Sequence, residues 1–234
     1  MSQNQGLKVL KLMIARLHKG KGVINMSKKK IIKISLAVFI LIILIFLIDL
    51  GRKAYILNKY SNRCEEYSKI TNFYVKRGQE EGVTSELWRK DNLAFLKITV
   101  DDATRMIHFG EDYNWIIIDS KDGKTAVKMI KEGGGAEVQT FVSGTLSLDN
   151  FWNTVALAFS SRILNEKIND IDCYKIFINE EWQMFIDKKD FLLMREINGS
   201  TDTGIIEYKF NNVKDEEVTI PNLAGYKIND TTQN

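Results

Sequence analysis

The chain has 234 residues and a formal net charge of +3, but the charge is unevenly distributed. Residues 1–55 hold eleven Lys or Arg against the single acid Asp49, a net charge of +10, which leaves 22 bases and 29 acids, a net charge of −7, in residues 56–234. An acidic body disfavours binding of nucleic-acid phosphates, and 44% hydrophobic residues with one Pro exclude a disordered or collagen-like chain. About 180 residues beyond the basic end suit a single domain.

Residues 31–48 form an apolar run, IIKISLAVFILIILIFLI, in which Lys33 is the only charge and lies close enough to the start to snorkel. A helix of this length is about 27 Å long, close to the hydrocarbon thickness of a bilayer. Four lysines lie before or at the start of the run, at Lys28, Lys29, Lys30 and Lys33, whereas Asp49, Arg52 and Lys53 follow it. By the positive-inside rule we expect a single-pass anchor with a cytoplasmic N-terminus and residues 51–234 outside the cell.

Two alternatives concern this end of the chain. A cleaved signal peptide shares the basic flank and apolar core, but the segment after Ile48 offers no small-residue cleavage pair, which favours an uncleaved anchor. The codons allowed for residues 20–26 include a purine-rich stretch like a bacterial ribosome-binding site, which favours Met26 as the start. The alternative is that residues 1–25 are translated and form an amphipathic helix on the membrane surface.

Beyond the anchor, apolar residues at three- and four-residue steps predict that residues 49–72 continue as a juxtamembrane helix. Short β-branched and aromatic runs separated by turn residues then predict an antiparallel sheet. The expected strands before the next helix are 73–77, 83–89, 93–100, 105–109, 115–119, 126–130 and 137–142. The glycines at 133–135 are expected to form a hairpin tip, because they match no phosphate-binding pattern.

A second helix is predicted to begin near an Asp149 cap, with one apolar stripe at Trp152, Val155, Ala156, Phe159 and Ile163. Strands are then expected at 173–179, 183–187, 192–198, 205–211 and 218–220. The economical assembly is an α+β fold: a strongly curved antiparallel sheet, an open half-barrel, with helices against its concave face. The expected division is a basic cytoplasmic segment 1–30, the anchor 31–48, the helix 49–72, an extracytoplasmic domain 73–228 and a tail 229–234.

The C-terminal half resembles the LolA-like group of periplasmic lipoprotein carriers and related sensor domains. The resemblance is carried by an order of features between Tyr174 and Ile228: a Tyr-led strand and then the motifs Ile186-Asp187-Lys188, Met194-Arg195-Glu196, a Gly/Thr turn, YKFNNV (208–213), Pro221 and Gly225-Tyr226. Upstream, residues 87–98 and the Trp115 strand are similar to the first hairpins of the same fold. The resemblance implies a half-barrel whose apolar cup takes lipid chains in the carriers.

The chain also resembles clostridial germination lipoproteins of the GerS type, which share this fold and act as partners of a cortex-modifying amidase. A transmembrane helix stands here in place of their lipidated cysteine, so the resemblance implies the fold and a protein partner but no partner-binding residues. The expected function is therefore a membrane-anchored, non-catalytic module that binds an envelope protein, such as a cell-wall hydrolase, in envelope, sporulation or germination processes. The alternative is binding of a lipid or lipoprotein acyl chain in the apolar cup.

The body carries few residues suited to catalysis. His108 is its only histidine, and with two cysteines it provides too few ligands for an ordinary zinc site. Adjacent carboxylates on a strand point to opposite faces and cannot jointly flank a bond, so we expect no enzyme, cofactor or metal. A cup for an acyl chain would be lined by aromatic and aliphatic residues, which could equally be ordinary core, the reading we prefer for them. The candidates are Trp115, Phe151, Trp152, Val155, Phe159 and Ile163.

Cys64 and Cys173 leave three states open, because an extracytoplasmic domain permits disulfides. They could bond to each other, Cys64 could bond to another chain, or both could remain thiols. Sequence alone does not show whether their Cα atoms approach within about 7 Å, the limit for a disulfide.

Overall fold

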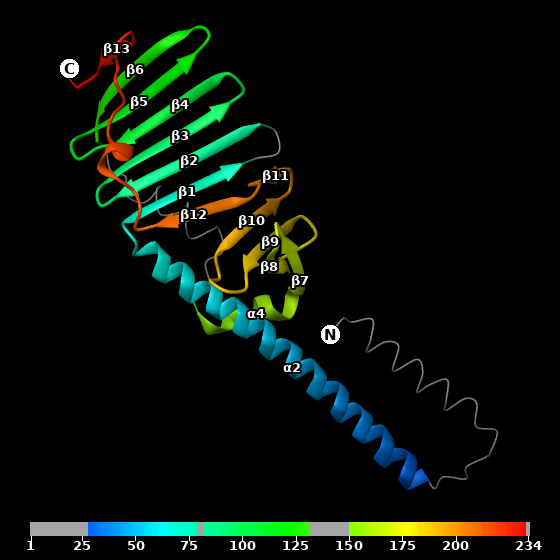
Figure 1. Ribbon diagram of the computed structural model, residues 1–234. Helices are drawn as coiled ribbons and strands as arrows, with labels where there is room; N and C mark the ends of the chain where they lie inside the picture. Colours follow the sequence, from blue (N-terminus) through cyan, green and yellow to red (C-terminus); the bar gives the residue numbers. More distant parts are fainter. Residues whose placement is uncertain (1–27, 79–81, 132–149, 233–234) are drawn as a thin grey trace. The chain divides into compact units, whose positions relative to one another are not determined.

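The computed structural model describes residues 28–78, 82–131 and 150–232 (Figure 1). The expectations for residues 1–25, the Gly133–Gly135 tip, the strand at 137–142 and the Asp149 cap lie outside these ranges. The chain divides into two compact units, Met1–Asp49 and Leu50–Asn234. The described part of the protein has an α+β fold that contains a long apolar N-terminal helix and large, mainly antiparallel, unclosed sheets.

The long helix α2 spans Lys28–Ser68 without a break, so the apolar run continues directly into the helix predicted after it. By length and composition α2 could cross a membrane, and its most apolar window has none of its residues buried within the protein. From Leu50 onward the helix belongs to the second unit, where Ile56, Leu57 and Tyr60 are fully buried. The helix stops at Ser68, so Ile70, predicted to be helical, lies in the connection to the first strand.

The strands within the described residues form two sheets instead of the single curved sheet expected. The eight-stranded sheet has the order β12-β1-β2-β3-β4-β5-β6-β13, and the five-stranded sheet the order β11-β10-β9-β8-β7. The first contains β1 (Asn72–Gly78), β2 (Val83–Lys90), β3 (Leu93–Val100), β4 (Ala103–Phe109), β5 (Tyr113–Ser120), β6 (Gly123–Ile130), β12 (Ile206–Phe210) and β13 (Lys227–Asp230). The second contains β7 (Arg162–Ile168), β8 (Ile171–Phe177), β9 (Trp182–Asp187), β10 (Leu193–Asn198) and β11 (Thr201–Asp202).

Tight turns with Asp and Asn at left-handed backbone positions connect several neighbouring strands. Asp91 and Asp101 have φ angles of 53° and 49°, and the β7–β8 turn places both Asn169 and Asp170 at positive φ. Asn and Asp tolerate this conformation better than other non-glycine residues, which is why they recur where a two-residue hairpin needs it. The predicted hairpins from β1 to β6 are therefore present with nearly the expected boundaries.

Several elements differ from the prediction, since β7, β11 and β13 match none of the expected strands. The second helix, α4 (Phe151–Ser160), begins at an Asn150 cap, whose side chain accepts a hydrogen bond from the Asn153 amide at 2.8 Å. It ends before Ile163, which lies instead on β7. The predicted strand at 218–220 is replaced by the end of a short 3₁₀ helix, η1 (Asp215–Val218), and an extended connection.

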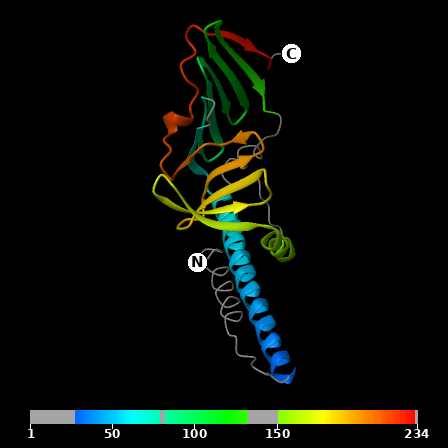
Figure 2. The same cartoon turned by 90° about the vertical axis from the view of Figure 1, so that its right-hand side faces the viewer.

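One hydrophobic core joins both sheets, α4 and the second-unit part of α2. Its members come from elements far apart in the sequence, which explains why the two sheets fold as one compact unit. Representative buried residues are Ile56, Leu57 and Tyr60 of α2, Phe73 and Val75 of β1, Leu87 of β2, Ala158 of α4, Ile163 of β7, Ile176 of β8, Ile186 of β9, Leu193 of β10 and Ile206 of β12. Figures 1 and 2 show the C-terminal, cyan part of α2 next to the strands of this unit.

Candidate functional site

The face of the eight-stranded sheet opposite the core carries a row of mostly aromatic side chains, here called the aromatic row. Directly paired residues on neighbouring strands place their side chains on the same face of a sheet, so the strand register defines the row. Its members in spatial order are Lys209 (β12), Tyr74 (β1), Trp88 (β2), Phe95 (β3), His108 (β4), Trp115 (β5) and Lys128 (β6).

Ring contacts connect the first part of the aromatic row. The Tyr74 and Trp88 ring centroids are 5.1 Å apart, and those of Trp88 and Phe95 are 6.0 Å apart, both in tilted arrangements. The Lys209 ammonium lies 5.3 Å from the Tyr74 ring centroid. These distances are within the range of favourable aromatic and cation–π geometry, so the side chains of this part of the row stabilise one another.

The segment 211–226, here called the strap, crosses this face between β12 and β13 (Figure 2). It is attached at its start by Asn72, which accepts a hydrogen bond from the Val213 amide at 2.9 Å and donates one to the Val213 carbonyl at 3.3 Å. At its far end the Tyr226 hydroxyl donates to Asp119 at 3.0 Å. Between these points η1 contacts β2 and β3, and Val218 is fully buried. The strap therefore covers the middle of the aromatic row.

His108 fastens the strap rather than facing solvent. Its Nε2 lies 2.9 Å from the Val218 carbonyl oxygen, and because a carbonyl can only accept, Nε2 carries the proton. The side chain is buried, and its Nδ1 finds no hydrogen-bond partner among the described residues. Burial lowers the pKa of His108, while the bond to Val218 acts in the opposite direction. With its protonated nitrogen committed to the main chain, His108 has a structural role here.

Where the strap leaves the row uncovered, the surface has an open depression of about 210 Å³. Strap residues form one wall and the row forms the floor. The lining residues are Tyr74, Trp88, Lys209, Asn212, Val213 and Glu217. The Tyr74 hydroxyl donates to Glu86 at 2.8 Å, and burial together with this carboxylate raises the pKa of Tyr74, so the phenol stays a neutral donor.

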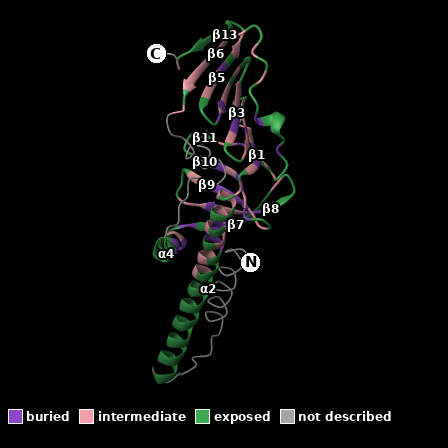
Figure 3. Cartoon of the chain, turned by 90° about the vertical axis from the view of Figure 1, so that its left-hand side faces the viewer, coloured by how far each residue is buried: buried purple, intermediate pink, exposed green. Residues whose placement is uncertain are grey.

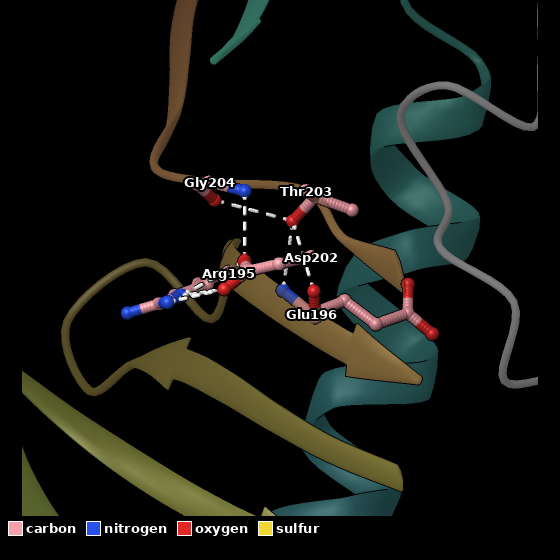
Figure 4. A network of polar contacts seen from close by, with 5 residues as sticks. All are labelled: Arg195, Glu196, Asp202, Thr203 and Gly204. Atoms are coloured by element: carbon pink, nitrogen blue, oxygen red, sulfur yellow. Dashed lines mark hydrogen bonds and ion pairs between the residues drawn. The ribbon is translucent and has the colours of Figure 1, made fainter. Parts of the chain in front are cut away.

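Two of the motifs that carried the family resemblance, Met194-Arg195-Glu196 and the Gly/Thr turn, meet in a polar network at the edge of the five-stranded sheet (Figure 4). The Arg195 guanidinium holds the Asp202 carboxylate from both Nε and Nη2, with Nε at 2.9 Å from Oδ1, and this pairing lowers the pKa of Asp202. Asp202 also accepts from the Gly204 amide, and the Thr203 hydroxyl accepts from the Glu196 amide. The network holds the turn from β11 that sends the chain to β12 and the other sheet.

The cup residues predicted from sequence lie on three different elements. Trp115 belongs to the aromatic row on β5, and Ile163 is in the core on β7. The α4 residues are mainly at the surface, with exposed fractions of 69% for Phe151, 74% for Trp152 and 67% for Phe159, and Val155 half-buried. The preferred interpretation of these side chains as core is therefore wrong for the three aromatics. Thr154 and Ala158 form the buried side of the helix.

Both cysteines are free thiols in the structure. Cys64 lies beside Tyr60 on α2, where burial raises the pKa of its thiol to about 11. Cys173 is fully buried on β8 opposite Asp187, and its pKa is raised by burial and by that carboxylate. Neither thiol has the lowered pKa that characterises a reactive cysteine.

Comparison with known proteins gives little information on function. No protein-family model matches the chain, and none of the curated proteins matches it. Among solved structures, it is similar to the crystal structure of an uncharacterized conserved protein from Thermus thermophilus, with 9% sequence identity and a TM-score of 0.43. The similarity covers 74% of this chain and 98% of that one.

Sequence reasoning did not find the aromatic row, although the alternation around Tyr74, Trp88 and Phe95 marks the face that each strand turns outward. What sequence could not supply was the pairing of β12 with β1, which joins residues about 130 positions apart. It also could not show that the strap covers His108.

Proposed function

We propose that the protein is a single-pass membrane-anchored module whose LolA-like body, outside the cytoplasm, binds an envelope protein without catalysing a reaction. The observation that carries the anchor is the apolar segment of α2, which is long enough to span a bilayer and has none of its residues buried in the protein. The lysines before it support a cytoplasmic N-terminus. The α+β fold with unclosed sheets is compatible with an open half-barrel.

The depression at the end of the aromatic row supports protein binding at that site. Small-molecule pockets usually enclose about 300–1,000 Å³, whereas this one is open and measures about 210 Å³. Tyr74 and Trp88 form its floor, and Tyr and Trp are residue types that often anchor protein interfaces. Lys209 adds a positive charge beside them. A protruding side chain of a partner fits this chemistry better than a whole acyl chain. The resemblance to GerS-type proteins suggests a cell-wall hydrolase as the partner.

Cross-linking in intact cells tests partner binding. Lys209→Met removes the charge at the depression but keeps an aliphatic stem, and Lys167→Met is the matched control on an exposed part of β7. We expect one envelope protein to be cross-linked to the wild type and to Lys167→Met but lost with Lys209→Met, at unchanged thermal stability. Equal cross-linking by all three chains would place the partner elsewhere. Stoichiometric lipid bound to the purified chain would favour the alternative, lipid handling.

The anchor has its own test. Protease added to intact cells should degrade the body, and the chain should float with vesicles after reconstitution. Release of the body as a soluble product, or protection from external protease, would contradict the proposed topology.

A further inference from the structure

Helix α4 carries three large aromatic side chains at the surface of its unit. Phe151 and Trp152 contact each other edge to face, with centroids 5.4 Å apart, and Phe159 lies two turns further along the same side of the helix. All three are at least two-thirds exposed, whereas Thr154 and Ala158 are buried. Figure 3 shows that α4 has both exposed and buried residues. A compact group of large apolar side chains on the surface usually marks a site that something apolar covers.

Contacts with α2 place α4 at the start of the second unit, and this position indicates what covers its aromatic side chains. The Arg52 guanidinium donates to the carbonyl of Ile163, three residues after the end of α4, at 3.5 Å. Leu50 of α2 and Leu157 of α4 pack against the same core. The helix α4 therefore lies beside the first turn of the unit.

Chain connectivity then limits the distance from this turn to the apolar run. Arg52 follows Ile48, the last residue of the run, by only four positions. Even a fully extended chain covers at most about 14 Å in four residues, so this limit holds for any arrangement of the two units. If the run ends at a membrane surface, Arg52 lies within about 14 Å of the edge of the hydrocarbon, in the headgroup region or directly beyond it, and α4 is next to it.

We propose that the face of α4 formed by Phe151, Trp152 and Phe159 lies in the interface of the bilayer crossed by the apolar run, as a second membrane contact. The proposal rests on the anchor proposed above. At ten residues α4 is about 15 Å long, too short to span the hydrocarbon but suited to lie in the interface. Trp is favoured at this depth, and its indole can keep its N–H among polar headgroups.

The charge near α4 also suits a lipid surface. Arg162 is exposed directly after the helix, and Arg52 and Lys53 come from α2. Residues 56–234 are net acidic as a whole, so the exposed Arg162 and the neighbouring Arg52 give this end of the unit positive charges. Basic side chains close to an anionic leaflet are attracted to it. A soluble partner or a second copy of the chain could also cover an aromatic face. The short distance between α4 and the apolar run favours the membrane over both of them.

The test is fluorescence of the full chain in vesicles made from equal parts of phosphatidylcholine and phosphatidylglycerol, with a spin-labelled phosphatidylcholine as quencher at headgroup depth. The difference between the wild type and Trp152→Phe isolates the emission of Trp152. The matched control adds Tyr113→Trp to the Trp152→Phe chain. Tyr113 is an exposed aromatic on β5, which Figures 1 and 2 show at the opposite end of the unit from α4.

We expect the Trp152 emission to be shifted to the blue and quenched by the labelled lipid, and the Trp at position 113 to show neither effect. The double change Phe151→Ser and Phe159→Ser should remove most of the quenching without changing the unfolding temperature, since both side chains are exposed. The control Ile130→Ser, also at an exposed position, should leave the quenching intact.

Flotation of the same samples separates this proposal from the anchor. A chain that floats with vesicles while Trp152 remains unquenched and emits as in water would overturn the membrane contact and leave the anchor standing. A blue-shifted but unquenched Trp152 would also overturn it, because protein rather than lipid would then cover the face. A chain that does not float would overturn both.

Discussion

Truncation of Val218 to Ala measures how firmly the strap is docked on the aromatic row. Its side chain is fully buried, so Val218→Ala removes two buried carbons, worth about 1.6 kcal/mol at ~0.8 kcal/mol each. A residual cavity brings the total to about 2 kcal/mol. The bond from His108 is made to the main-chain carbonyl and survives the substitution. In a domain of this size, that loss lowers Tm by about 4–8 °C.

Thermal unfolding of the full chain in detergent, followed by near-UV circular dichroism, provides the measurement. Val100→Ala is the matched control, because it makes the same truncation at a 42% exposed position on β3. It should lower the free energy of unfolding by about half as much or less, in proportion to its smaller buried area. The reasoning is refuted if the two variants unfold at the same temperature, since Val218 would then contribute no more than an exposed valine.

Two further predictions concern the titratable groups of the core and the strap. Burial lowers the pKa of folded His108, so the free energy of unfolding should fall as pH drops below the unfolded value of about 6.5, by up to about 1.4 kcal/mol per pH unit until the folded pKa is reached. Urea titrations of wild type and His108→Gln check this: their difference should vary with pH in that window, and a constant difference would contradict a buried neutral imidazole. For the cysteines, the raised pKa values predict almost no alkylation by iodoacetamide at pH 8 in the native chain and two modified thiols after unfolding without reductant. Fewer than two after unfolding would demonstrate a disulfide.

Local features of the fold were predictable because they depend on neighbouring residues. Asp91 and Asp101 lie between segments of alternating pattern and indicate hairpin turns there. The three- and four-residue spacing of Ile56, Leu57 and Tyr60 predicts the buried stripe of α2. The failures lie where two local signals conflict. Ile163 continues the spacing of α4, yet Ser161 ends the helix, with its amide bonded to the Leu157 carbonyl at 2.8 Å, and the chain enters β7.

The α4 stripe shows why periodicity alone does not identify a buried face. Sequence correctly groups Trp152, Val155 and Phe159 on one side of a helix, but the side that packs inward carries Thr154 and Ala158. Small side chains let a helix approach the core closely, and a hydrophobicity scale gives them little weight. The rule that the most apolar stripe of a helix packs into the protein core assumes that the rest of the helix surface is surrounded by water. Under the membrane contact proposed for α4, that assumption does not hold.

The same reasoning separates the aromatic residues by function. Trp115 and Trp152 look alike in sequence, as two members of one expected cup, but the register places Trp115 opposite His108 in the aromatic row, whereas Trp152 faces outward from α4. The first is held by the pairing of β5 with its neighbours β4 and β6, and the second is held only by the helix that carries it. A substitution of Trp115 should therefore affect the stability of the sheet and the strap. A substitution of Trp152 should affect only the contact of α4 with its surroundings. That difference allows each aromatic group to be tested without disturbing the other.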